Sequence, residues 1–181
     1  VRMNIYYKPM AELMEMLTNR TVDFVLAFRP TVRNEEIESH VLFDNHLAVI
    51  VKDSHSLASR ERISLTELEK FDMALPTKGL QARNALDQYL SRSMVKLNIR
   101  IELNEVNILL ELIKKSNLIT ILAEATIYNA TGVKAIPIEM PSNEMDGCVH
   151  MLKNAYRKRS SLAFIKLLKD SIAVRERVLD F

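Results

Sequence analysis

The chain has 181 residues, of which 48% are hydrophobic and 27% are charged, a composition typical of folded globular proteins and not of disordered or membrane-spanning chains. Its three glycines, Gly79, Gly132 and Gly147, are too few and too far apart for a dinucleotide-binding or P-loop phosphate site, which needs several glycines in one loop. A net charge of +2 is too small to indicate a nucleic-acid surface by itself.

Strand and helix patterns alternate from the start of the chain. Residues 1–7 predict a strand, and Pro9 suits the first turn of a helix whose apolar face repeats every three to four residues. Residues 22–28 are nearly continuously apolar, which is typical of a parallel strand covered on both faces. Residues 42–43 and 47–51 predict the next strand. The polar segment that follows, residues 53–62, marks the first boundary between subdomains.

The second part of the chain continues the alternation. Ser64 and Glu67 have the spacing of a capping box at a helix start. Asn107 and Ser160 are placed to cap two later helices, the second with Phe164, Leu167, Leu168 and Ile172 inward. The intervening segments predict strands at residues 72–75, 99–103, 118–122, 133–140 and 148–152, and a helix with Ala82, Leu86, Tyr89 and Leu90 buried.

This alternation predicts an α/β architecture with mainly parallel sheets. Two smaller sheets, one before and one after Asp53, account for the number of elements better than one large sheet does. The last strand and helix are free to return to either sheet.

Three stretches together resemble the effector-binding domain of LysR-type transcriptional regulators. Residues 16–26 are similar to that family's helix, polar turn and aspartate before a buried strand. The segment His55-Ser56-Leu57-Ala58-Ser59-Arg60, followed by a short capped helix, resembles the family's His-Pro-Leu-Ala turn. Residues 102–122 are similar to its strand, helix and buried strand.

The resemblance implies two Rossmann-like subdomains joined by a double crossover, as in type 2 periplasmic binding proteins. Subdomain I would comprise residues 1–52 and 147–181, without the family's usual first strand and helix, and subdomain II residues 53–146. It also implies a small-molecule effector in the cleft between the subdomains, and pairing into homodimers or tetramers. The winged helix-turn-helix that binds DNA is absent from this sequence.

The sequence departs from the family at three places. Ser56 stands where the family prefers proline, while Ser116-Asn117 and Ala123 stand where it has glycine and proline. The differences at Ser116-Asn117 and Ala123 affect the loops around the buried strand at residues 118–122.

Candidate effector contacts follow from the position of the loops at strand ends, since open parallel sheets bind ligands beyond the carboxyl ends of their strands. Thr77 precedes a helix whose first backbone amides would attract an anion, with opposing charge from Lys8, Arg29, Lys78 and Arg83. Alternatively, Thr77 caps its helix and the four cations are solvated surface residues. The predicted effector-binding set is Lys8, Pro9, Phe28, Arg29, Thr77, Lys78, Gly79, Asn107 and Ala123.

No catalytic or metal-binding pattern stands out. None of the four histidines has the helical spacing of a metal site with another ligand, and no cofactor motif occurs. Cys148 cannot form an intrachain disulfide and has no neighbouring base, so an enzyme is not expected. No secretory leader opens the chain and its longest apolar run, residues 47–51, is too short to span a membrane, so we expect a cytoplasmic protein.

We therefore predict the effector-sensing, dimerising domain of a LysR-type regulator, which binds a small molecule and controls an attached DNA-binding domain. The cations at the strand ends favour an anion as that molecule. The alternative is a stand-alone, two-lobed solute-binding protein. The start at Val1, already within a predicted strand, favours a fragment of a longer regulator.

Overall fold

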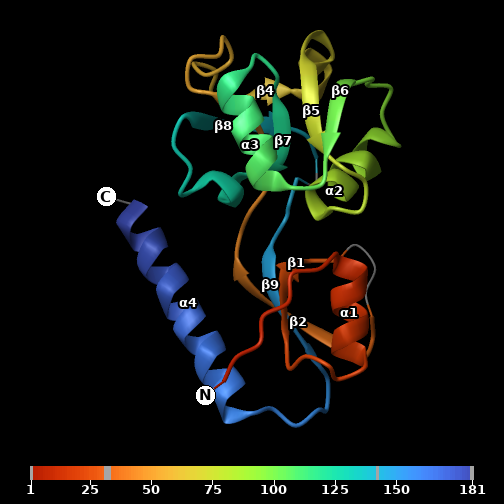
Figure 1. Cartoon of the computed structure of the whole chain (residues 1–181), viewed down its shortest axis with the longest axis vertical. Helices are drawn as coiled ribbons and strands as arrows, with labels where there is room; N and C mark the ends of the chain where they lie inside the picture. Colours follow the sequence, from red (N-terminus) through yellow and green to blue (C-terminus); the bar gives the residue numbers. More distant parts are fainter. Residues whose placement is uncertain (1, 31–33, 142, 180–181) are drawn as a thin grey trace. The chain divides into compact units, whose positions relative to one another are not determined.

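The computed structural model describes residues 2–30, 34–141 and 143–179, and divides into two compact units (Figure 1). Unit 1 comprises Val1–Asp44 and Asp146–Phe181, and unit 2 comprises Asn45–Met145. The chain passes between the units twice. The first boundary precedes the strand at residues 47–52, whereas the sequence placed it after that strand.

Unit 1 is built on a three-stranded sheet in the order β1-β9-β2. Its strands are β1 (Val25–Phe28), β2 (Ile37–Phe43) and β9 (Gly147–Leu152), and its helices are α1 (Met10–Thr18) and α4 (Arg159–Leu179). Both outer strands pair antiparallel with β9. The expectation that residues 22–28 form a parallel strand is therefore wrong.

Alternation along these strands supplies two apolar clusters in unit 1. On one face Leu17 of α1 packs with Val25 and Ile37. Another cluster joins Val149 of β9 to Ile165 of α4. Leu167 was predicted to point inward but is 68% exposed, and Ile165 is the buried residue instead. Ile172 lies outside the described side chains.

The predicted strand at residues 1–7 is not observed. Residues 2–9 form no helix or strand, and Ile5 and Tyr7 are 84% and 87% exposed. Val1 lies outside the described residues. An apolar segment becomes a strand only when a neighbouring strand takes its backbone hydrogen bonds, and none of the described strands pairs with this segment.

Unit 2 contains a four-stranded sheet in the order β4-β8-β3-β7 and a parallel pair, β5-β6. The strands are β3 (Leu47–Lys52), β4 (Ile63–Ser64), β5 (Asp72–Pro76), β6 (Asn98–Leu103), β7 (Thr120–Ala123) and β8 (Val133–Glu139). A parallel bridge between Met73 and Ile119 connects the two sets.

The prediction of mainly parallel sheets is wrong for unit 1 and holds only in part for unit 2. In unit 2, β3 runs antiparallel to β7 and β8, whereas β4 is parallel to β8. The two central antiparallel strands, β3 and β9, are those through which the chain enters each unit from the other one. Apolar runs indicate burial on both faces but not strand direction, so the sequence did not reveal this reversal.

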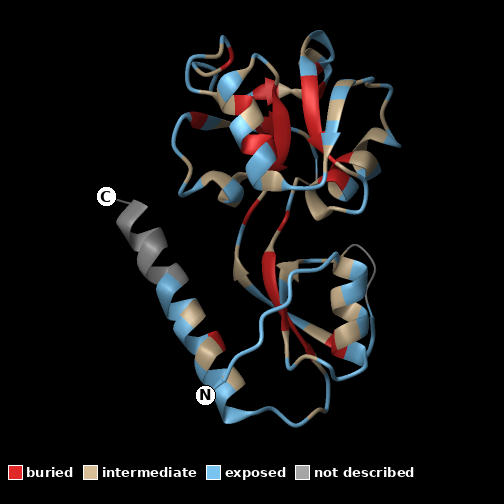
Figure 2. Cartoon of the chain, viewed as in Figure 1, coloured by how far each residue is buried: buried red, intermediate tan, exposed pale blue. Residues whose placement is uncertain are grey.

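The helical elements of unit 2 are η1 (Leu65–Lys70), α2 (Gln81–Leu90), α3 (Val106–Lys115) and η2 (Glu124–Ile127). Of the stripe predicted for α2, Leu86 is buried, whereas Ala82, Tyr89 and Leu90 are half-buried. Leu109 and Ile113 of α3 pack on Ile50, Ala74 and Leu122 of three strands. Figure 2 shows this buried centre in red beneath the exposed outer face of α3.

Of the three predicted caps, one is confirmed. Ser64 and Glu67 form the capping box of η1. The α3 cap is Glu105, whose carboxylate accepts the first free amides, so the prediction for Asn107 is wrong. Ser160 is also wrong as a cap, because α4 begins one residue earlier at Arg159. The longer side chain of Glu105 thus accepts from the backbone N–H groups for which the side chain of Asn107 was predicted.

The described helices include none that is long and apolar enough to cross a membrane.

His150 is a fully buried histidine in β9. The Ser39 hydroxyl lies 2.7 Å from Nδ1, and Nε2 lies 3.3 Å from the carbonyl oxygen of Ala27. Since a carbonyl only accepts, Nε2 carries the proton and Nδ1 accepts from Ser39. Burial lowers the pKa of His150 below its usual 6.5, although the bonds to backbone carbonyls oppose the shift.

We expect this histidine to destabilise the protein in mild acid. The unfolded chain binds the proton more readily than the folded chain, so the stability present above pH 6.5 is lost as the pH falls below that value. His150→Gln keeps one acceptor and one donor without titrating. Urea unfolding between about pH 5 and 7 should therefore give a shallower pH dependence for this variant than for the wild type. Equal slopes would contradict the assignment.

Candidate functional site

The carboxyl ends of β5, β6 and β7 share one edge of unit 2. The strands β5 and β6 pair in parallel, and β5 is bridged in parallel to Ile119, next to β7. Five of the predicted contacts lie at or just after these ends: Thr77, Lys78, Gly79, Asn107 and Ala123. The structure thus places these five at the same end of the two strand sets of unit 2.

The loop between β5 and α2 is held by backbone contacts. The amide of Thr77 donates to the Leu103 carbonyl at the end of β6, at 2.9 Å. Gly79 has φ +97°, which favours glycine, and its amide donates to Asn84 Oδ1 at 3.0 Å. Helix α2 begins after Leu80 with no side-chain cap, so Thr77 does not cap it. That part of the alternative reading is wrong.

Arg83 is not a solvated cation but a buried structural one. Its side chain is 4% exposed, and its guanidinium donates to the Pro76 carbonyl at 2.9 Å, to Asp87 at 2.8 Å and to Glu102 at 2.6 Å. These bonds tie α2 to the ends of β5 and β6. Arg83 therefore shapes the loop around Thr77, and its charge is already neutralised by protein groups.

The start of α3 is organised by Glu105. Its carboxylate accepts the amides of Asn107 and Ile108, each at 3.2 Å. The Asn107 side chain also donates to Glu105, at 3.1 Å. Asn107 is exposed, so it lies at the surface of this edge without capping the helix.

Ala123 is buried at the end of β7, opposite Leu47 in register. The next residue, Glu124, pairs with His46 through Oε2 and Nε2, which are 2.5 Å apart. The edge thus carries Lys78 and His46 together with the carboxylates of Glu105 and Glu124. Both carboxylates are already engaged by protein donors.

The four remaining predicted contacts, Lys8, Pro9, Phe28 and Arg29, belong to unit 1. Lys8 pairs with Glu12 at 3.3 Å, and Pro9 immediately precedes α1. Phe28 ends β1, and Arg29 pairs with Asp146 at 2.8 Å. Of the four predicted cations, Lys78 alone has no ion pair among the described residues.

Glu105, His46 and Glu124 lie at the edge in unit 2 but were missed from the sequence. A carboxylate just before a helix was a usable signal for Glu105. His46 and Glu124 are 78 residues apart in sequence, and only the antiparallel pairing of β3 with β7 brings them together. In the described ranges, no three His, Cys, Asp or Glu side chains cluster as a metal site would require.

Comparisons with known proteins agree on the family and the fold. A sequence model of the LysR substrate binding domain matches residues 1–173. A malolactic fermentation system transcriptional activator from Lactococcus lactis is 23% identical over 173 residues, covering 92% of this chain and 58% of that protein. The chain thus spans little more than half the length of this relative.

Two solved structures have the same α/β fold. The CcmR regulatory domain from Synechocystis, in complex with 2-PG, has a TM-score of 0.76 and 20% identity, covering 88% of this chain and 78% of that chain. The QuiR effector binding domain, in complex with shikimate, has a TM-score of 0.73 and 21% identity, covering 91% and 78% of the two chains. Since the family match extends over nearly the whole sequence, this chain belongs to the family of LysR substrate binding domains.

Proposed function

We propose that the chain is the effector-sensing, dimerising domain of a LysR-type transcriptional regulator in the cytoplasm, acting on DNA through a separate DNA-binding domain. The match to the LysR substrate binding domain over residues 1–173 carries this proposal. It favours a regulator over a stand-alone solute-binding protein, and a relative that matches over 92% of the chain is a transcriptional activator.

In this proposal the two units are Rossmann-like subdomains of the type 2 periplasmic-binding-protein class. The two chain passages, after Asp44 and after Met145, support the double crossover. Effector binding changes regulation only if the effector favours one arrangement of the protein over another, since a ligand that binds both equally shifts neither.

The effector contacts that we propose on unit 2 are Thr77, Lys78, Gly79 and Asn107, at the carboxyl ends of β5 and β6. Lys78 supplies positive charge there, and the N-cap residue of α2, Leu80, makes no side-chain cap bond. Together they favour an acceptor group on the effector, such as a carboxylate or phosphate. On unit 1, Lys8 and Arg29 are already paired with carboxylates, so we assign them a smaller contribution.

A thermal-shift screen against anionic and neutral metabolites tests the proposal directly. A ligand that binds only the folded state raises the apparent melting temperature with the logarithm of its concentration relative to its Kd. We expect stabilisation by one or a few related anions. Stabilisation by neutral compounds alone would contradict an anionic effector, and no stabilisation by any metabolite would count against sensing.

Thr77→Val should weaken binding of any effector found in that screen about fivefold, the loss of one hydrogen bond of roughly 1 kcal/mol. Within the described residues the Thr77 hydroxyl has no hydrogen-bond partner, while its amide bond to Leu103 survives the change, so the fold should not suffer. Calorimetric titration of both proteins measures the effect. Thr131→Val, an exposed threonine elsewhere in unit 2, is the matched control. Equal affinities for Thr77→Val and wild type would remove Thr77 from the site.

A further inference from the structure

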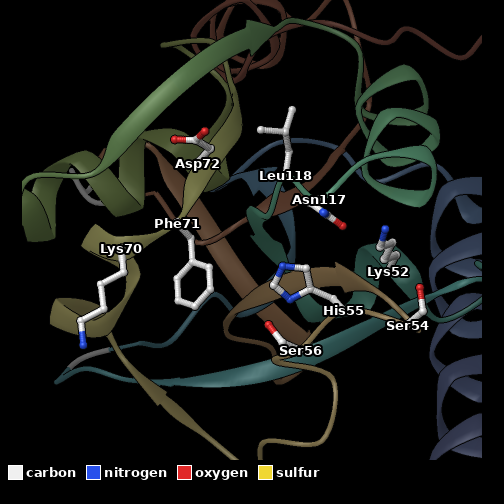
Figure 3. A pocket seen from close by; sticks show the side chains of 9 residues that line it. All are labelled: Lys52, Ser54, His55, Ser56, Lys70, Phe71, Asp72, Asn117 and Leu118. Carbon is white, nitrogen blue, oxygen red and sulfur yellow. The ribbon is translucent and has the colours of Figure 1, made fainter.

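Unit 2 has a concavity at the opposite end of its strands from Thr77 and Lys78 (Figure 3). Strand β3 ends there at Lys52 and β5 begins there at Asp72, whereas Thr77 follows the other end of β5. Five residues of strand separate the two ends by roughly 15 Å. The cavity has a volume of about 520 Å³, and none of the proposed effector contacts lines it.

One wall of this cavity is fixed by His55. The Leu57 amide donates to its Nδ1 at 3.1 Å, and the other ring nitrogen donates to the Asn117 backbone carbonyl. The imidazole therefore fastens the turn after β3 to the loop before β7. Its ring lies beside that of Phe71, with centroids 5.9 Å apart and planes inclined by 57°. Both nitrogens are occupied, so the wall is in place before any ligand arrives.

The cations and hydroxyls around this wall have no partners among the described residues. Neither Lys52 nor Lys70 forms an ion pair with any residue that the structure describes. Within the described part of the chain, the hydroxyls of Ser54 and Ser56 also have no hydrogen-bond partner. In Figure 3, Lys52 and Ser54 lie on one side of the imidazole and Phe71 on the other.

The negative charge at the cavity is already neutralised. Asp72 accepts hydrogen bonds from Asn98 and from Arg100, the latter at 3.0 Å. Burial, together with the nearby Lys52, lowers the pKa of His55, against the raising effect of the bond to Asn117, so the imidazole is neutral at pH 7. The uncompensated charge in the cavity is therefore that of the two lysines.

We propose that this cavity is a second ligand site of the domain, for a small organic anion that carries a planar ring. The anionic group binds the Lys52 ammonium and the Ser54 hydroxyl, and the ring packs on Phe71. Rigid walls lower the entropic cost of binding, and the volume suits a molecule of this size. The site is independent of the proposed effector contacts, since it lies at the other end of the strands.

Benzoate is a suitable probe, with benzamide as its neutral counterpart and acetate as the anion without a ring. In a two-dimensional NMR titration of the full chain, benzoate should shift the amide signals of His55, Phe71 and Asn117 saturably, with a Kd on the order of millimolar. Benzamide and acetate should each bind at least about fivefold more weakly, which is the loss of one favourable contact.

Variants separate this site from general charge attraction and from the effector site. Lys52→Gln should weaken benzoate binding about fivefold. Lys134 lies on the neighbouring strand β8 and does not line the cavity. Lys134→Gln therefore removes the same charge nearby and should change benzoate binding less than twofold. Thr77→Val should not affect it. The proposal is overturned if the signals do not saturate, if benzamide binds as well as benzoate, or if the two lysine variants weaken binding equally. A loss in Thr77→Val would assign benzoate to the effector contacts instead.

Discussion

Replacing Arg83 with methionine should lower the free energy of unfolding by about 2–3 kcal/mol, through loss of a buried cation that holds three elements together. Burial opposes the charge of Arg83, but the hydrogen bonds to Asp87 and Glu102 outweigh it and raise its pKa. Without the guanidinium, the Pro76 carbonyl loses its partner inside the protein. The two carboxylates are partly exposed and become hydrated, which limits the loss.

Urea unfolding at pH 7 measures this effect, and two variants control it. Arg92→Met removes an exposed arginine just after α2 and should change the stability by less than about 0.5 kcal/mol. Arg83→Lys keeps the charge but lacks the planar group that reaches three acceptors, so it should recover only part of the loss. If Arg83→Met were as stable as Arg92→Met, the buried network would have no net stabilising effect.

The elements of the chain were largely predictable because their signals are local. The Ser64–Glu67 capping box and the burial of Leu86 in α2 depend on residues within one or two turns, and both are present in the structure. Strand pairing is not local. The antiparallel direction of β3 and β9 depends on the path of the chain as it enters each unit from the other one. The apolar periodicity of a strand carries no information on that path.

The candidate site was predictable in position more than in chemistry. Strand order placed Thr77, Lys78 and Asn107 at one edge, because the ends of parallel strands meet there. The partners of the charged groups were not predictable, since Arg83 meets Glu102 from a strand 19 residues away. The cavity beside His55 was also missed, because its walls come from three separate loops.

Gly147→Ala should lower the free energy of unfolding by about 2–3 kcal/mol, near the upper range for inserting one methyl group into a packed site. Gly147 begins β9 opposite Phe43 of β2, and the ring of Phe43 covers its Cα. An added Cβ would lie 2.3 Å from Cζ of that ring, well inside contact distance. Either the ring leaves its place or the strands separate, and both cost packing at the point where the chain re-enters unit 1.

A double-mutant cycle tests whether the ring of Phe43 causes this loss. Phe43→Leu removes the ring atoms that meet the new methyl group, so Gly147→Ala should cost at least about 1 kcal/mol less in that background than in the wild type. Chemical unfolding of the four proteins gives the coupling free energy. Additive losses would show that the ring is not what excludes a side chain at position 147.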